Sequence, residues 1–513
     1  MDWTHGTNGL LVAYAVSAVA VLVGLLIGRA PASRTLAFPL IAIPVFIGGV
    51  LLWTAMAGPL KATAIASSLL PYLGLAFIAI FSGLAGKLFA KLPENKNYKR
   101  GTILEEPNQK FTYKILKPKG LTLAGLAVPE SDETKHFKMI GTTGTGKSTA
   151  IRELLGGAIE RGDRAVIADP DGSYLKHFYE PSRGDVILNP FNSRAARWDL
   201  FGEMTTLYDA DQLALSMIPD TDGTERPWRG YARVFLTSVL RQLHRVKHDD
   251  VAELYRLISS TPADDLRDLL ADTPAGPYLA QDNGKFFGAV RAVANTHLAA
   301  LEPIALQSSR SSLSVREWIR RGRGVLFLPY HANEIAILRS IISTWMRLAI
   351  YETMSQPQGE SDDQHLWFAI DELDALGPID GLKDALARLR KFGGRCVLGF
   401  QSIAQVSGSY GHAEAQTIVE NCGNTLILRC SASEGGGTAR FASSLIGERE
   451  IVREQVTKSR RPNEFLSTQS VAQHHVTESA VLASEVEQLP DLEGYLKFAS
   501  TPEWKRVRLP APT

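Results

Sequence analysis

An eight-residue segment of the chain carries the residue types that bind a polyphosphate. The segment is Gly141-Thr142-Thr143-Gly144-Thr145-Gly146-Lys147-Ser148, and it matches the pattern Gly-x4-Gly-Lys-Ser/Thr at every fixed position. Glycines let the backbone wrap closely around phosphates with its amide groups pointing inward. The lysine can reach the outer phosphates, and the serine hydroxyl can ligate Mg²⁺. We therefore predict that residues 141–148, with Thr149 behind them, bind ATP and Mg²⁺.

The residues around this segment favour a nucleotide site over the alternative, a glycine-rich turn before an ordinary helix. Residues 137–140 form an apolar run that predicts a buried strand. Residues 148–161 predict a helix with its apolar side chains on one face. A helix that begins at the phosphate loop adds the partial positive charge of its amino-terminal end. Strand, glycine loop and helix in this order are the context that the motif requires.

A pair of carboxylates, Asp371-Glu372, directly follows the apolar run 366–370. The pair is therefore predicted at the carboxyl end of a buried strand, which is where ligands bind in open α/β sheets. We expect Asp371 to serve Mg²⁺ and Glu372 to orient and deprotonate the attacking water. The alternative is an acidic turn that only ends a strand, and the phosphate loop upstream favours the catalytic interpretation.

Two further polar positions follow along the chain. Arg390 comes just after a predicted helix at residues 382–389. A cation there could be a solvated partner of the helix dipole, or it could reach a neighbouring subunit's γ-phosphate as an arginine finger. The residues alone do not decide between these roles. Gln401 closes the predicted strand 396–400, where its amide could contact the γ-phosphate or its water, or simply cap the strand.

From about residue 91 onward, strand-like runs alternate with helical patterns, which predicts a parallel sheet with crossover helices. Residues 199–315 interrupt this alternation, with helical patterns at 232–243 and 251–258 and no comparable strand signal. A structureless loop of that length would be improbable. We therefore predict an all-α domain at 199–315, inserted between the two parts of a nucleotide-binding domain at 91–198 and 316–513. The polar stretch 457–475 is predicted to be an exposed loop.

The first 90 residues have a different composition, because Asp2, Arg29, Arg34, Lys61 and Lys87 are their only charged residues. The apolar runs 10–28 and 36–57 are long enough to cross a bilayer core, which takes about 20 residues, and 62–86 is a weaker third candidate. A buried helical hairpin is the alternative. Cations between the first two runs and after the third favour three spans with the amino end outside and the residues after the third run in the cytoplasm.

Charge and cysteine content exclude some classes of protein. The chain has 55 basic and 54 acidic residues, which argues against a purely electrostatic nucleic-acid binder such as a histone. Its three cysteines all lie late in the sequence and show no metal-ligand spacing.

Several of these features occur together in one order. They are the apolar amino-terminal runs and the motifs at residues 141–148, 189–192, 366–372, 389–393 and 399–402, with a helical insertion between the second and third of these motifs. In this order they resemble the conjugative coupling proteins of type IV secretion systems, of the TraG/TraD type, over nearly the whole chain. Two spans are common in that family, so the third apolar run is a departure from its pattern.

The resemblance implies a homo-hexameric ring of RecA-like motors beneath a membrane stem. The fold class is accordingly expected to be α/β, a RecA-like P-loop NTPase domain with an inserted all-α domain and an amino-terminal transmembrane region. Matched motif by motif, the resemblance assigns nucleotide binding to Lys147 and Ser148, Mg²⁺ to Asp371, the base to Glu372, the trans-acting arginine to Arg390 and the γ-phosphate sensor to Gln401.

The function that the resemblance implies is an ATPase in the bacterial inner membrane that pumps single-stranded DNA, with its relaxase, toward a secretion channel. Its expected partners are single-stranded DNA, relaxase and relaxosome proteins, and inner-membrane components of the secretion system. One alternative is a membrane receptor that recruits secreted proteins and uses ATP as a conformational switch. A chromosome-segregation translocase would normally carry a long linker and a winged-helix tail, and neither is evident in this sequence.

Overall fold

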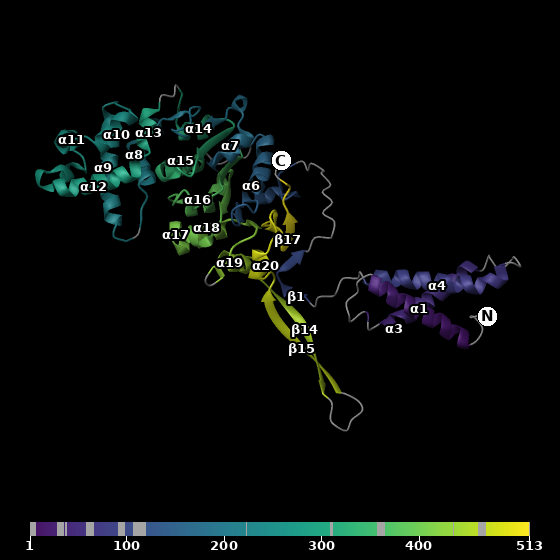
Figure 1. Cartoon of the computed structure of the whole chain (residues 1–513). Helices are drawn as coiled ribbons and strands as arrows, with labels where there is room; N and C mark the ends of the chain where they lie inside the picture. The colour runs from purple at the N-terminus through teal and green to yellow at the C-terminus, as the bar shows by residue number, and fades with distance from the viewer. Residues whose placement is uncertain are drawn as a thin grey trace. The chain divides into compact units, whose positions relative to one another are not determined.

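The structure is a computed structural model, and it describes residues 7–27, 35, 38–57, 66–90, 98–105, 120–221, 223–307, 311–356, 365–433, 436–459 and 468–511. The chain divides into two compact units, Met1–Tyr98 and Lys99–Thr513. Each unit is described by itself (Figure 1).

Among the described residues of the first unit, the long helices coincide with the three apolar runs: α1 (Thr7–Ile27), α3 (Phe38–Ala57) and α4 (Ala66–Ala90). Helices α1 and α4 pack so closely that a Cβ atom at Gly24 would lie 2.2 Å from the carbonyl oxygen of Gly83. The hydroxyls of Ser17 and Ser82 are 2.8 Å apart in the same contact. Within the described residues, no helix meets the combined length and apolarity needed to cross a membrane. Arg29 and Arg34, on which the predicted orientation depends, lie outside the described residues.

The second unit is built on a ten-stranded mixed sheet with the order β2-β17-β16-β13-β5-β12-β11-β6-β10-β7. The seven strands from β13 to β7 are parallel, whereas β16 is antiparallel to both of its neighbours, β13 and β17. The strands are β2 (Ile103–Glu105), β5 (Phe137–Ile140), β6 (Arg164–Pro170), β7 (Val186–Ile187), β10 (Val325–Tyr330), β11 (Leu366–Ile370), β12 (Gly394–Phe400), β13 (Asn424–Ile427), β16 (Glu493–Lys497) and β17 (Glu503–Arg508).

Helices cover both faces of this sheet, so its central strands are buried on both sides. Successive residues of β6 alternate between two hydrophobic clusters, Val166 and Ala168 in one, and Ala165 and Ile167 in the other. The helices that contact strands of the sheet are α6 (Lys147–Glu160), α7 (Ser173–Phe178), α15 (Ile335–Ser355) and α16 (Leu382–Leu389). Further helices that pack against other helices are α14 (Val315–Arg321), α17 (Ile403–Tyr410), α18 (His412–Asn421), α19 (Gly437–Ile446) and α20 (Ala483–Glu487).

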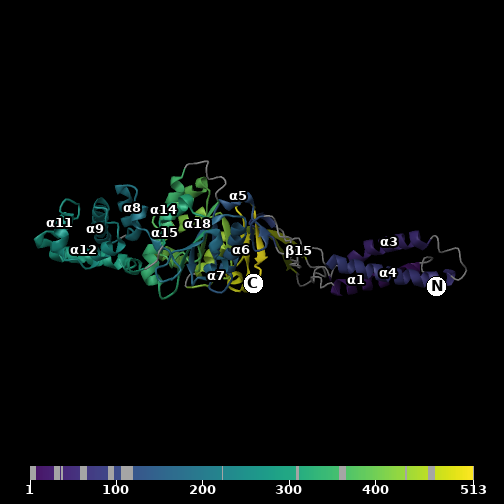
Figure 2. The same cartoon turned by 90° about the horizontal axis from the view of Figure 1, so that it is seen from above.

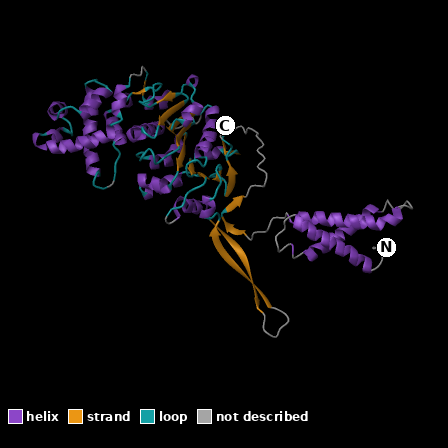
Figure 3. Cartoon of the chain, in the orientation of Figure 1, coloured by secondary structure: helices purple, strands orange, loops and turns teal. Residues whose placement is uncertain are grey.

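A helical region interrupts the sheet between two short parallel strands, β8 (Arg197–Trp198) and β9 (Ser312–Leu313). Every regular element described between them is helical, and these helices gather at one end of the second unit (Figures 1 to 3). The α-helices are α8 (Leu207–Met217), α9 (Arg226–Arg245), α10 (Val251–Ser259), α11 (Ala263–Leu270), α12 (Gly284–Leu298) and α13 (Leu301–Leu306).

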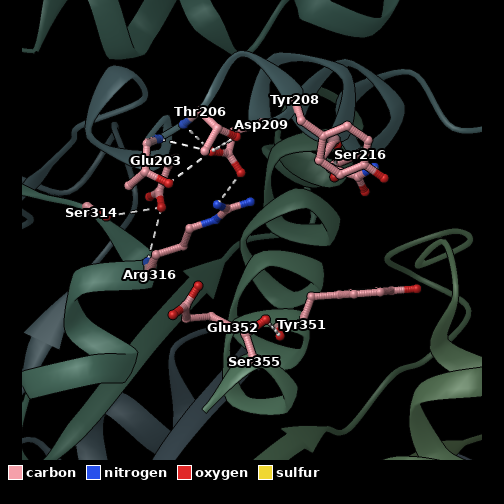
Figure 4. Close-up of polar contacts among 12 residues, drawn as sticks. Glu203, Thr206, Tyr208, Asp209, Ser216, Ser314, Arg316, Tyr351, Glu352 and Ser355 are labelled. Carbon is pink, nitrogen blue, oxygen red and sulfur yellow. Dashed lines mark hydrogen bonds and ion pairs between the residues drawn. The ribbon is translucent and has the colours of Figure 1, made fainter. Parts of the chain in front are cut away.

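Glu203 joins the segments that enter and leave this helical region (Figure 4). Its fully buried carboxylate accepts hydrogen bonds from the Ser314 hydroxyl at 3.0 Å and from the backbone amides of Val315 and Arg316 at 2.6 and 3.1 Å. The indole of Trp198 donates a further bond at 2.9 Å. Burial raises the pKa of Glu203, and these four donors oppose the shift. The carboxylate therefore links the segment that enters the helical region to the segment that leaves it.

The structure corrects the prediction for residues 457–475. Residues 457–459 and 468–475 are not a loop but belong to a long antiparallel ribbon of β14 (Glu448–Ser459) and β15 (Thr468–Ser479), whose twelve residues each pair throughout. Residues 460–467 lie outside the described residues. Polar composition misled the prediction, because a strand with a solvated face does not need apolar side chains on it. His474 and His475 are exposed on β15, and His475 lies 3.1 Å from Glu450.

Candidate nucleotide-binding site

The phosphate loop connects β5 to α6 at the carboxyl edge of the parallel strands. Gly144 and Gly146 have φ angles of 80° and 114°, a backbone conformation that favours glycine. A Cβ atom at Gly146 would lie 2.8 Å from the side chains of both Leu492 and Leu509, and one at Gly141 would lie 2.8 Å from the Thr145 hydroxyl. Close packing therefore requires glycine at both ends of the loop, and φ requires it at Gly144 and Gly146.

Lys147 lies folded over its own loop. Its ammonium donates to the carbonyl oxygens of Gly141 at 2.7 Å and Thr142 at 3.4 Å. The residue is only 7% exposed, and burial lowers its pKa, while Asp371 and Glu372 oppose the shift. A polyphosphate in the loop would give this ammonium an anionic partner, which makes a stronger hydrogen bond than a neutral carbonyl does.

Asp371 follows β11 and faces the first turn of α6. One of its carboxylate oxygens, Oδ2, accepts hydrogen bonds from the Ser148 hydroxyl at 2.5 Å and from the Tyr174 hydroxyl at 2.8 Å. The other oxygen, Oδ1, is buried and has no hydrogen-bond partner among the described residues. A carboxylate oxygen without a partner beside a hydroxyl suits Mg²⁺, which prefers oxygen ligands. Ser148 and Asp371 are therefore the residues that would hold the ion.

Glu372 and Gln401 connect the end of β11 to the phosphate loop. The Gln401 amide donates to Glu372 Oε1 at 3.0 Å, and its oxygen accepts from the Thr143 hydroxyl at 2.9 Å. Burial raises the pKa of Glu372, Asp371 and Asp374 raise it further, and the hydrogen bond from Gln401 opposes the shift. A raised pKa makes this carboxylate a stronger base, which suits the removal of a proton from water.

These groups line one cavity of about 470 Å³. The structure thus brings together the phosphate loop, Asp371, Glu372 and Gln401. The other residues that line this cavity are Arg152, Pro170, Asp171, Ser173, Asp491 and Leu492.

The carboxy-terminal wall of the cavity is not predicted from the sequence as part of the site. The Leu492 amide donates to the Thr145 carbonyl at 3.0 Å, and Asp491 forms an ion pair with Arg429 at 2.6 Å. A proline-flanked acidic residue carries no such signal by itself. Tyr174 was also not predicted as part of the site. The turn that follows the strand at residues 164–170 lies at the same edge of the sheet and could have indicated that nearby residues contribute to the site.

Arg390 is the one predicted catalytic residue that the structure does not bring to this cavity. It lies just before β12, at the opposite, amino edge of the sheet. Seven strand residues at about 3.3 Å each place it about 20 Å from the carboxyl end of its own strand. The side chain is exposed and makes no hydrogen bond or ion pair with any residue that the structure describes. Arg390 therefore does not reach the phosphate loop of its own chain.

Comparisons with known proteins agree with this architecture. A family model described as the type IV secretion-system coupling protein DNA-binding domain matches residues 120–510. The chain therefore belongs to the type IV secretion-system coupling protein family, as its motifs predicted. The TrwB coupling protein in complex with ADP and Mg²⁺ has a TM-score of 0.69 and 29% identity, covering 81% of this chain and 95% of TrwB. The complex of TrwB with the ATP analogue ADPNP has a TM-score of 0.69 and 30% identity, covering 82% and 95%.

Relatives known from sequence are longer than the matched region. Coupling protein TraD of Escherichia coli (strain K12) is 29% identical over 399 residues, which are 76% of this chain and 55% of TraD. Conjugal transfer protein TraG of Escherichia coli is 24% identical over 347 residues, which are 61% of this chain and 53% of TraG. The chain thus spans about half the length of these curated relatives. The predicted α/β fold with an all-α region is confirmed, and the transmembrane part of that prediction stays a prediction.

Proposed function

From its membership of the coupling protein family, we propose that the chain is an ATP-driven motor that couples a relaxase-bound DNA substrate to a type IV secretion channel during conjugation. In this proposal it pumps single-stranded DNA, and relaxosome proteins deliver the cargo. The observation that carries the proposal is the single cavity that joins Lys147, Ser148, Asp371, Glu372 and Gln401. The matched family model, described as a DNA-binding domain, supports the choice of DNA as substrate.

Hydrolysis needs a base, an anchor for the phosphates and a group that senses them. Lys147 would bind the outer phosphates, and Ser148 and Asp371 would hold Mg²⁺, whose charge would offset that developing on the transferred phosphoryl group. Glu372 takes a proton from the attacking water. Gln401 is hydrogen bonded to Glu372 and to Thr143 of the phosphate loop, so it is placed to report the phosphate state to the base.

Arg390 acts in this proposal on a neighbouring subunit. Its place at the amino edge, about 20 Å from its own phosphate loop, leaves an adjacent chain as the source of any phosphate that it contacts. A permanently charged, planar guanidinium suits a phosphoryl group. The complete site then requires a ring, for which a homo-hexamer is our proposal.

Membrane attachment remains part of the proposal through the first 90 residues. Their near lack of charge supports insertion into the bacterial inner membrane by two or three helices, next to the inner-membrane components of the secretion system, with the motor in the cytoplasm. Single cysteines introduced at residue 3 and at residue 31 distinguish the topologies. Three spans expose the first to periplasmic thiol reagents and shield the second, whereas labelling of residue 3 from the cytoplasm would refute three spans.

ATP hydrolysis by the full-length chain, measured with and without single-stranded DNA, tests the motor directly. We expect DNA to stimulate turnover. Glu372→Gln should lower turnover by about 10²–10⁴-fold while it retains nucleotide binding, because the amide keeps the shape of the side chain but cannot accept the proton. Turnover that is indifferent to DNA, together with ATP-dependent binding of a secreted protein, would instead support the receptor function.

A further inference from the structure

We propose that Tyr174 is a positioning residue for Mg²⁺: its hydroxyl fixes the orientation of the Asp371 carboxylate, which would hold the ion together with Ser148. The inference rests on the proposed nucleotide site and assigns a role to a residue outside its motifs. Tyr174 is fully buried on α7, and it contacts Asp371 across the sequence from a different element.

The two oxygens of Asp371 have opposite surroundings. Oδ2 accepts two hydroxyls, from Ser148 at 2.5 Å and Tyr174 at 2.8 Å. Oδ1 is buried without a partner among the described residues, and the whole residue is only 4% exposed. An unpaired buried oxygen of this kind is costly unless a ligand or water completes it. Oδ1 lies against β12, since a Cβ atom at Gly399 would be 3.1 Å from it, whereas Oδ2 lies beside the Ser148 hydroxyl. The two hydroxyls on Oδ2 therefore set the orientation of the whole carboxylate.

The position of Tyr174 is itself fixed by the sheet. Asp169, at the end of β6, is fully buried and accepts the backbone amides of Tyr174 at 3.0 Å and Leu175 at 2.7 Å. The turn between them is tight, with φ angles of 56° at Asp171 and 65° at Gly172. Asp169 therefore holds the start of α7, and the tyrosine ring packs into the core beneath the site.

The two hydroxyls on Oδ2 would have different roles when the site is loaded. Ser148 is the residue that the phosphate-loop motif assigns to Mg²⁺, and its oxygen can ligate the ion while its O–H still donates to Asp371. Tyr174 is the partner of Oδ2 that the motif does not assign to the ion. Without it the carboxylate would be held by Ser148 alone and would rotate more freely about its terminal bond, whose energy profile is broad. Residues that orient metal ligands in this way typically contribute a factor of about 10–100 in metal affinity.

A purely structural role for Tyr174 predicts a different result. Its ring would fill the core, and its hydroxyl would use Asp371 merely as a convenient acceptor. Tyr174→Phe separates the two roles, because phenylalanine keeps the ring and removes only the hydroxyl. A structural role would change stability and leave the Mg²⁺ requirement as it is.

The test is calorimetric binding of the non-hydrolysable ATP analogue ADPNP to the full-length chain, in EDTA and in a Mg²⁺ titration. For Tyr174→Phe we expect affinity in EDTA to stay within about twofold of wild type, because Lys147 and the loop are intact. The Mg²⁺ concentration that gives half of the Mg²⁺-dependent gain in affinity should rise about tenfold.

Tyr410→Phe is the matched control. Tyr410 is a buried tyrosine on α17 whose hydroxyl accepts the Ile379 amide at 3.2 Å, and it does not line the nucleotide cavity. The Tyr410→Phe variant should bind Mg²⁺ and ADPNP as the wild-type chain does. An unchanged Mg²⁺ midpoint in Tyr174→Phe, or an equal loss of affinity in EDTA and in Mg²⁺, overturns the inference. Failure of the wild-type chain to bind ADPNP at all would overturn the proposed nucleotide site itself.

Discussion

The two edges of the ten-stranded sheet surround their buried polar groups in opposite ways. At the carboxyl edge, Asp371 Oδ1, Asp374 Oδ1 and the Tyr330 hydroxyl are buried without hydrogen-bond partners among the described residues. At the amino edge, the buried charges of Glu133, Asp163 and Arg395 belong to one paired network, although Nε of Arg164, at the start of β6, is also buried without a partner among the described residues. Burial alone does not distinguish the edges, since Asp371 and Arg395 are 4% and 6% exposed.

The pairing at the amino edge forms a connected network. Glu133, just before β5, accepts two bonds from Arg161, each at 2.8 Å, and one from Arg395 at 3.1 Å. Arg161 also binds Asp163 at 2.6 Å, and the Trp367 indole donates to Asp163 at 2.8 Å. Burial pushes the pKa of Glu133 upward, but the two arginines hold it below its usual value.

The difference indicates what each edge is for. A network whose members satisfy one another needs no ligand and contributes to the fold, whereas a set with missing partners is completed by something from outside. Substitutions at the carboxyl edge should therefore change ligand binding and turnover, and substitutions at the amino edge should change stability. Arg390, which is exposed at the amino edge, is the expected exception.

The largest effect is expected at the carboxyl edge. Lys147→Ala should reduce ATP hydrolysis to background, because the phosphate charge loses its main cation. The thermal midpoint without nucleotide should change little, since the ammonium only bonds to two carbonyls of its own loop. Turnover and circular dichroism melting of the same preparation measure both. Wild-type turnover in this variant would refute the site.

Arg390→Ala tests the exception. If the guanidinium completes a neighbour's site, turnover should fall by about 10³–10⁵-fold, although the residue is far from its own nucleotide. Mixing Arg390→Ala with Lys147→Ala subunits should restore some hydrolysis, because a mixed interface can combine one intact loop with one intact arginine. Arg388→Ala, a neighbouring exposed arginine, is the control. Absence of rescue, together with turnover that is linear in protein concentration, would show that Arg390 does not act across subunits.

Glu133→Gln tests the amino edge itself. It leaves Arg395 buried without its anionic partner, and breaking a buried pair in this way costs about 3–5 kcal/mol. Urea unfolding should show this loss, while ADPNP affinity stays unchanged under native conditions. Asp264→Ala removes an exposed partner of Arg267 and should cost less than about 1 kcal/mol. A matching loss of nucleotide affinity in Glu133→Gln would mean that the two edges are not separable.

Sequence predicts the carboxyl edge better than the amino edge for a physical reason. The phosphate loop and Asp371-Glu372 are each a contiguous segment whose chemistry fixes residue type and spacing, so the residue pattern alone assigns Lys147 and Ser148 to the site. Gln401 was assigned only by the family resemblance, because its residue type alone left a capping role open. The helix at 382–389 and the helical insertion are also predicted, because their apolar periodicity is local. The network around Glu133 joins residues far apart in sequence, and no local sequence pattern predicts such pairing.

The same reasoning explains the elements that sequence patterns do not predict. Strands β16 and β17 and the wall at Leu492 reach the site through long-range pairing with β13, which the sequence does not show. Tyr174 has an ordinary apolar neighbourhood, and only the orientation of α7 makes it a partner of Asp371. The loop prediction was wrong for residues 457–459 and 468–475 of the ribbon β14–β15, because this polar sequence lacks the alternation of apolar and polar residues that indicates most strands.

The smallest expected effect concerns pH and the amino edge. His136 is 2% exposed; its Nδ1 accepts the Cys396 amide at 3.0 Å, so the proton lies on Nε2, which donates to the Leu386 carbonyl at 2.9 Å. Burial lowers its pKa to about 4, and Arg390 and Arg395 add to the shift while the bond to Leu386 opposes it. Between pH 4 and the unfolded value near 6.5, the unfolded chain binds more protons than the folded one, so stability rises with pH.

Acidification from about pH 6.5 to about pH 5 should therefore remove on the order of 2 kcal/mol of stability through this one residue. Urea unfolding of wild type and His136→Gln at several pH values isolates the contribution, because all other titrating groups are shared. The variant should start less stable, since glutamine cannot reproduce both hydrogen bonds, but its profile should be flatter by that amount. Parallel profiles would show that His136 takes up a proton as readily in the folded chain as in the unfolded one, so that the amino edge tolerates a proton that its paired hydrogen bonds are expected to exclude.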